Sequence, residues 1–267
     1  MSVDSELRSL DIEIPAQPEV LVKLSVLMAE DEIDLLAVSA LVEGDMALAA
    51  AVLKAVNSSL YGLRGRVQTV HQALTYLGMR EVSAIAFEMS LRAAFPPAAE
   101  LEPVWERAAR RGLMMGRIGQ MLGIDPWAAH SAGLFEECGK AVLYRHAPQH
   151  YPAMLRAAVT DPELCDLESA AFGVSHDALG AALCESWGLA PAAVASVRHH
   201  VAVQTTGEMP EALQRRGVAA ISAIVAAMMN DPDALETRVN QIAPQAQVDP
   251  AAAMRAARRV QEQLEQS

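Results

Sequence analysis

The chain has 267 residues, of which 52% are apolar but only 4% aromatic, and its formal net charge is −12. This length fits one or two domains with a sizeable core, and a core with so few rings must use Ala, Leu, Val and Met, which favour closely packed helices. We therefore expect an all-α protein. The negative charge repels a phosphate backbone, so we expect no nucleic-acid partner.

The N-terminal part of the chain predicts a series of short amphipathic helices. They span about 18–29, Asp34–Val42, Asp45–Gly62, Val70–Leu77 and Arg80–Ala94. Asp45 can cap the first free amides of its helix, and Gly62 tolerates the left-handed turn that ends it. Pro96-Pro97 then interrupts the pattern and is the predicted boundary between two subdomains.

Asp-Pro pairs punctuate the second half of the chain. Each places an acid that can cap a helix before the residue best suited to its first position, so we expect helices to begin near 126, 162, 232 and 250. A long helix is predicted over Trp105–Leu122, and another begins at Pro191 and carries His199 and His200. The last helix places Met254, Ala257, Val260 and Leu264 on one side.

The cysteines and the apolar stretches bear on the cellular compartment. Cys138, Cys165 and Cys184 form no Cys-x-x-Cys pair, so we expect buried, reduced thiols and neither a disulfide framework nor a thiolate zinc site. The acidic N-terminus lacks the apolar run of a secretory signal. The most apolar stretch, Val218 to Met229, is shorter than the ~20 residues of a membrane span. A soluble, cytoplasmic protein without a membrane partner is therefore expected.

Characteristic residues follow one another in three blocks. The first is Gly44-Asp45-Met46-Ala47-Leu48 running into Leu53–Gly62 with Asn57 and Ser58; the second is Thr69–Gly78, ending in Leu77-Gly78; the third holds Gly133, Gly139-Lys140, Glu168, His176, Gly180, Trp187 and His199-His200. In these blocks the chain resembles the HDOD family, the HD-related output domains of bacterial signalling proteins, from Leu10 to about Met229. Met46 and Ala190 depart from it, because the family usually has Pro at both positions.

The resemblance implies an HDOD domain over residues 10–229. In it, an N-terminal helical subdomain (10–95) packs on an HD-like helical subdomain (98–229), and residues 230–267 form a C-terminal helical extension. The resemblance also implies a regulatory role in bacterial signal transduction through protein–protein contact. A homo-oligomer is compatible with this role.

The same resemblance locates the positions at which an HD-type phosphohydrolase would hold a catalytic metal. They are Arg107 for the first histidine, Glu136 and Glu137 for the His-Asp pair, Ser222 for the closing aspartate, and His176 with His199 and His200. Arginine has no lone pair to offer a metal, and adjacent helical residues such as His199 and His200 point about 100° apart. We therefore expect no catalytic residue, no bound metal and no other cofactor.

Each candidate has a structural alternative. Glu136 and Glu137 could hold Mg²⁺, but we interpret them as a solvated pair partnered by Lys140. We interpret His176 as a core or interface histidine, since Ser175 and Asp177 fit the first turn of a helix.

Two further polar features are open to two interpretations. Arg107, Arg110 and Arg111 share one helical stripe that could hold an anion; we interpret it as a solvated face. Asn57 lies on the apolar face of Leu53 and Leu60, so we expect it to be buried and to pin a neighbouring loop. The alternative for Asn57 is recognition of a partner.

The sequence thus favours a non-catalytic signalling domain. The alternatives are a metal-dependent phosphohydrolase that uses Glu136, Glu137, His176 and His200, and a nucleotide- or anion-binding sensor without turnover.

Overall fold

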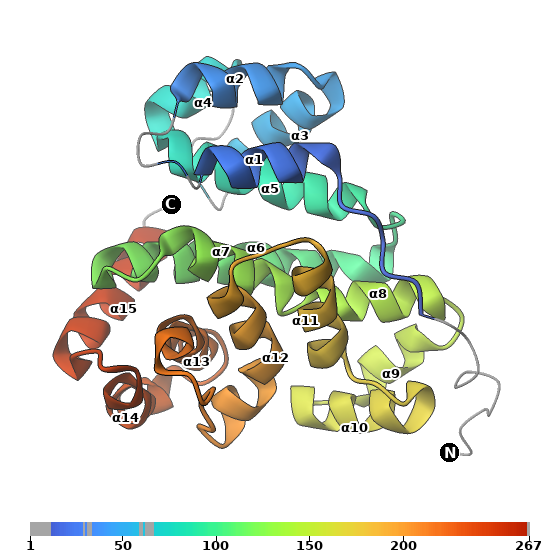
Figure 1. Ribbon diagram of the computed structural model, residues 1–267, viewed down its shortest axis with the longest axis vertical. Coiled ribbons are helices and arrows are strands. Elements are labelled where there is room, and N and C mark those ends of the chain that lie inside the picture. The colour runs from blue at the N-terminus through green and yellow to red at the C-terminus, as the bar shows by residue number, and fades with distance from the viewer. Residues whose placement is uncertain (1–11, 29, 31–33, 59–60, 62–66, 266–267) are drawn as a thin grey trace. The chain divides into compact units, whose positions relative to one another are not determined.

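The computed structural model describes residues 12–28, 30, 34–58, 61 and 67–265, and these residues form helices and no strand (Figure 1). The predicted all-α fold is confirmed. The chain divides into two compact units. The smaller unit comprises Ala16–Ala94 and the end of the chain from Arg259, and the larger unit comprises Phe95–Arg258 with the segment up to Pro15.

The smaller unit contains the first five helices of the chain. They are α1 (Glu19–Met28), α2 (Leu35–Glu43), α3 (Met46–Val56), α4 (Val70–Leu77) and α5 (Met79–Ala93). Helix α5 contacts each of the other four, and its residues Val82–Glu88 are buried. Among the described residues no single helix is both long and apolar enough to cross a membrane; α2 and α3 reach that length and composition only together, and they are bent by 110° at their junction.

Helix α3 begins as predicted but ends earlier. The carboxylate of Asp45 accepts hydrogen bonds from the amides of Ala47 and Leu48 at 2.9 and 3.0 Å. At the other end the Asn57 amide nitrogen donates to the Leu53 carbonyl at 2.9 Å and to the Val67 carbonyl at 2.7 Å, and its oxygen accepts from the Val67 amide at 3.2 Å.

Asn57 therefore does pin a later part of the chain, although it is half-buried rather than buried. Its side chain takes up backbone groups at the point where the helix would otherwise continue, which gives a physical reason for the early end. Ser58 is exposed. Leu60, Gly62 and the Arg64-Gly65-Arg66 segment lie outside the described residues.

The larger unit contains most of the remaining helices. They are α6 (Glu102–Leu122), α7 (Pro126–Phe135), α8 (Cys138–His146), α9 (Tyr151–Ala157), α10 (Asp161–Phe172), α11 (His176–Ser186), α12 (Pro191–Thr205), α13 (Arg216–Asn230) and α14 (Leu235–Ile242), and α15 (Pro250–Glu265) begins in it. The predicted helix start near 232 is a short 3-10 turn, Pro232–Ala234, which leads into α14. Residues Val218–Met228 of α13 are buried, as expected for the most apolar stretch of the chain.

Glycines allow the helices of this unit to approach closely. A Cβ atom on Gly133 of α7 would lie 2.8 Å from the backbone of Gly112 in α6, and one on Gly139 of α8 would overlap the carbonyl oxygen of His176 at the start of α11. Trp187 follows α11, and its indole N–H donates to the Pro15 carbonyl at 2.9 Å. Gly133 and Gly139, two residues of the third sequence block, therefore serve helix packing.

Candidate functional site

The sequence pair Glu136-Glu137 lies at the junction of α7 and α8, inside the larger unit. Glu136 follows the last residue of α7 and Glu137 precedes the first residue of α8. Their relative exposures are 0% and 1%. The interpretation as a solvated pair is therefore wrong. Two adjacent buried carboxylates require nearby positive charge, because an unpaired buried charge is costly.

Arg111 of α6 supplies that charge. Its Nη1 atom lies 2.9 Å from Glu136 Oε2 and 3.1 Å from Glu137 Oε1, and its side chain is fully buried. The interpretation of the arginine stripe as a solvated face is thus wrong for Arg111, although Arg110 is exposed. Arg107 stays at the edge, with its side chain 45% exposed and its Nε 3.9 Å from Glu137 Oε1.

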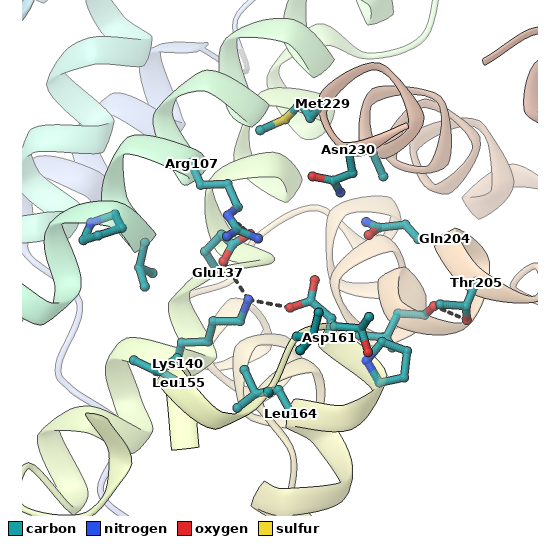
Figure 2. A pocket seen from close by; sticks show the side chains of 18 of the residues that line it. Arg107, Glu137, Lys140, Leu155, Asp161, Leu164, Gln204, Thr205, Met229 and Asn230 are labelled. Atoms are coloured by element: carbon teal, nitrogen blue, oxygen red, sulfur yellow. Dashed lines mark hydrogen bonds and ion pairs between the residues drawn. The ribbon is translucent and has the colours of Figure 1, made fainter. Parts of the chain in front are cut away.

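Lys140 extends the charge cluster toward α10. Its Nζ lies 2.8 Å from both Glu137 Oε2 and Asp161 Oδ1, so the predicted partnership with Glu137 is confirmed (Figure 2). Asp161 does not cap its helix as expected. Thr160 takes that role in a capping box with Glu163, which leaves the Asp161 carboxylate free to bind Lys140.

Helices α12 and α13 complete the cluster on the Glu136 side. The Gln204 amide nitrogen donates to Glu136 Oε2 at 3.1 Å and to Ser222 Oγ at 3.0 Å. The Ser196 hydroxyl donates to Glu136 Oε1 at 3.5 Å. Ser222 is fully buried, and its hydroxyl oxygen accepts the hydrogen bond from Gln204. The structure therefore brings this predicted position to the cluster.

His176 and His200 are buried side by side, with ring centroids 5.4 Å apart. His176 Nδ1 lies 2.7 Å from Glu168 Oε2, and His200 Nδ1 lies 2.7 Å from the Val197 carbonyl oxygen. Both acceptors favour a proton on Nδ1. His176 is fully buried, as the interpretation of it as a core histidine requires. His199 is only half-buried, in agreement with the expected divergence of adjacent helical side chains.

The charges of the cluster stabilise one another. Burial alone raises the pKa of Glu137, but Lys140 and Arg111 outweigh it and bring this pKa to about 2. Burial likewise raises the pKa of Asp161, but the charge of Lys140, and to a smaller extent His176, outweighs burial and lowers this pKa below its usual range. The pKa of Lys140 is raised despite burial, chiefly by Glu137. Burial lowers the pKa of His200, which is therefore neutral near pH 7.

A cavity of about 1010 Å³ lies over one side of the cluster. Its wall includes Arg107, Glu137, Lys140, Asp161 and Gln204, as Figure 2 shows. Acidic and basic side chains line it in equal number; they are Glu100, Glu137, Asp161 and Asp231, and Arg107, Lys140, Arg156 and Arg238. The cavity therefore offers both hydrogen-bond donors and acceptors without a dominant charge.

The chain also resembles known proteins. Residues 14–203 match the HDOD domain. A curated, uncharacterized protein of Treponema pallidum (strain Nichols) is 25% identical over 197 residues, which are 70% of this chain and 37% of that protein. The chain thus spans well under half the length of this relative.

Several solved structures share the fold. An HDOD domain protein with unknown function from Geobacter sulfurreducens superposes with a TM-score of 0.71 at 17% identity, covering 97% of this chain and 99% of that chain. For a protein of Marinobacter aquaeolei VT8 named for signal transduction, the TM-score is 0.70 at 19% identity, with 95% and 58% covered. For a Shewanella amazonensis SB2B protein named as a phosphohydrolase, it is 0.67 at 20% identity, with 97% and 94% covered. With the family match over most of its length, the chain belongs to the HDOD domain family.

Proposed function

We propose that this chain is a non-catalytic signal-transduction domain that acts through contact with protein partners. The observation that carries the non-catalytic part is the position of Arg111. Its guanidinium binds both Glu136 and Glu137, the residues that stand where an HD-type phosphohydrolase has its metal-binding His-Asp pair. A covalently attached cation thus takes the place of a metal ion.

The geometry disfavours a catalytic metal beside these residues. A metal that activates water needs lone-pair donors around it and an open coordination position. Arg111 offers no lone pair, and the nearest oxygens of Glu136 and Glu137 already lie 2.9 and 3.1 Å from its Nη1. Two unit positive charges about 4 Å apart repel by about 4 kcal/mol at an effective dielectric constant of about 20, and a divalent ion doubles this figure.

A hydrolysis assay tests the non-catalytic role. The purified full chain should not hydrolyse phosphomonoesters or cyclic dinucleotides with Mg²⁺, Mn²⁺, Fe²⁺ or Zn²⁺, under conditions in which an active HD-type hydrolase does. Metal-dependent turnover that Glu136→Gln or His200→Ala abolishes, and that Arg110→Ala leaves intact, would overturn the proposal. Arg110 is the matched control because it is exposed on the helix that carries Arg111.

Contact with a protein partner is the role that the family resemblance supports. Affinity capture from the source organism, with the full chain as bait, should identify a protein that also binds when both are purified. Size-exclusion chromatography of the purified pair should then give a complex of defined stoichiometry. If every captured protein elutes separately from the purified chain, this part of the proposal fails.

The cavity favours a second candidate, a small-molecule sensor without turnover. Its volume of about 1010 Å³ is at the upper end for ligand pockets. Of the arginines considered for anion binding, Arg107 lines it, whereas Arg111 is buried in ion pairs and Arg110 does not contribute. A nucleotide at 100 times its dissociation constant would add about 2.7 kcal/mol to stability, which a thermal-shift screen detects.

A further inference from the structure

A sulfur, a nitrogen and an oxygen donor converge where α10 meets α11. Cys165 Sγ lies 3.7 Å from His176 Nδ1, which lies 2.7 Å from Glu168 Oε2. The donor atoms of these residues all lie within 4.8 Å of one another. Among the described residues, no other set of three such side chains meets this condition.

Local backbone geometry brings these donors together. Cys165 and Glu168 are one helical turn apart on α10, so they share a face. Gly173 ends α10 with a left-handed φ of 77°, and the returning chain places His176 at the first position of α11. The His176 amide also donates to Glu168 Oε2 at 2.7 Å, which fixes the start of α11 against this carboxylate.

The members of the cluster differ in burial. Glu168 and His176 are fully buried, whereas Cys165 is half-buried. All three cysteines were expected to be buried. Cys138 and Cys184 are buried, but Cys165 is not fully so. The Tyr151 hydroxyl donates to Glu168 Oε1 at 2.5 Å and orients the carboxylate from behind, as groups around metal ligands commonly do.

We propose that Cys165 Sγ, His176 Nδ1 and Glu168 Oε2 form a binding site for a borderline-soft divalent cation, with Zn²⁺ as the best match. Thiolate, imidazole and carboxylate are the three ligand types of protein zinc sites. The fourth position would take water, or the Asp177 carboxylate, whose Oδ1 lies 3.9 Å from Cys165 Sγ.

The observed distances are close to those that zinc requires. Zinc–ligand bonds of about 2.0–2.3 Å place tetrahedral donors about 3.3–3.6 Å apart. The sulfur–nitrogen distance of 3.7 Å needs almost no change, whereas the nitrogen–oxygen distance of 2.7 Å must widen by about half an ångström. This widening requires a rotation of the Glu168 carboxyl group, which also lengthens the hydrogen bond that its Oε2 accepts from the His176 amide.

Zinc binding at this site releases one proton. The Cys165 thiol loses its proton to solvent and becomes the thiolate ligand. The His176 proton shifts from Nδ1 to Nε2, so that the Nδ1 lone pair is available to the metal. The absence of a Cys-x-x-Cys pair argued against a thiolate zinc site, but a single thiolate joined by donors from the next helix does not need that pair.

Cobalt provides a spectroscopic test on the full chain. Addition of one equivalent of Co²⁺ should produce the near-ultraviolet absorption of a cobalt–thiolate bond, and Zn²⁺ should displace it. Cys165→Ser should remove this absorption and weaken Zn²⁺ binding at least about tenfold, the lower end of losses seen even for residues that only support a ligand. The matched control is Cys184→Ala, a buried thiol outside the cluster, which should retain both.

The proposal fails if wild-type protein shows no thiolate absorption with Co²⁺, or if the absorption persists in Cys165→Ser. A second measurement avoids any folding defect of the variant. In wild-type protein, Zn²⁺ should protect Cys165 from alkylation as read by mass spectrometry, and undiminished alkylation would refute the site. The outcomes of the two tests are distinguishable, because hydrolysis is tested at Glu136 and His200 and zinc binding at Cys165.

Discussion

Replacement of Arg111 by Met should destabilise the protein by about 3–5 kcal/mol at pH 8. Removing one partner of a buried ion pair has this cost because the other charge stays buried without compensation. Lys140 still lies 2.8 Å from Glu137 Oε2 in the variant, so Glu136 is the carboxylate that loses its ionic partner. The estimate therefore counts one uncompensated charge rather than two.

A second substitution identifies the cause of this loss. In Arg111→Met the Glu136 carboxylate stays buried without its ionic partner. The added substitution Glu136→Gln removes that buried charge, so the double variant should recover part of the loss.

Urea denaturation followed by circular dichroism measures these changes. The matched control is Arg110→Met, which removes an exposed arginine of the same helix and should stay within about 0.5 kcal/mol of wild type. If Arg111→Met is as stable as Arg110→Met at pH 8, Arg111 is not the counter-ion of the cluster. A loss that the added Glu136→Gln does not reduce would point to lost packing instead.

Three other changes can be measured in the same way. The stability of the wild type should decline as pH falls below about 6.5, because the folded pKa of His200 is lowered. It should decline again below about 4.5, because the folded pKa of Glu137 is about 2, and this second loss should reach on the order of 3 kcal/mol. Constant urea midpoints from pH 8 to pH 3 would contradict both. Asn57→Ala should cost roughly 1–3 kcal/mol, because the part-buried backbone groups of Leu53 and Val67 lose their hydrogen bonds. An unchanged midpoint with lost partner binding would make Asn57 a recognition residue. Gly139→Ala should destabilise strongly, since its Cβ has no room against the α11 backbone, and a wild-type melting curve for this variant would show that the helices can separate without cost.

The helices were predictable because local chemistry defines them. Asp45 precedes α3 and caps it, and Pro126 and Pro191 begin α7 and α12 as expected. Asp161 is the instructive exception. The Asp-Pro pattern suggested a cap, but Thr160 followed by Glu163 was the stronger local signal for the helix start. That signal would have indicated that Asp161 is not needed as a cap, so that its carboxylate can take part in the charge cluster.

The charge cluster could not be read from the sequence in the same way. Helical periodicity places Arg107, Arg110 and Arg111 on one stripe, but it does not say which of them points into the core. That depends on contacts with residues distant in sequence, such as Glu136 at the end of α7. The resemblance indicated Arg107 for the first histidine, whereas the structure places the Arg111 guanidinium, one helical turn further on, between the carboxylates.

The guanidinium of Arg111 is part of the polypeptide and remains protonated at any pH at which the protein is folded. The core around Glu136 and Glu137 therefore receives its positive charge during synthesis, without loading from the cellular metal pool. A chelator cannot strip this cation and a competing ion cannot replace it. The charge balance at Glu136 and Glu137 should consequently be the same in metal-starved and metal-replete cells, which would suit the proposed contact with protein partners.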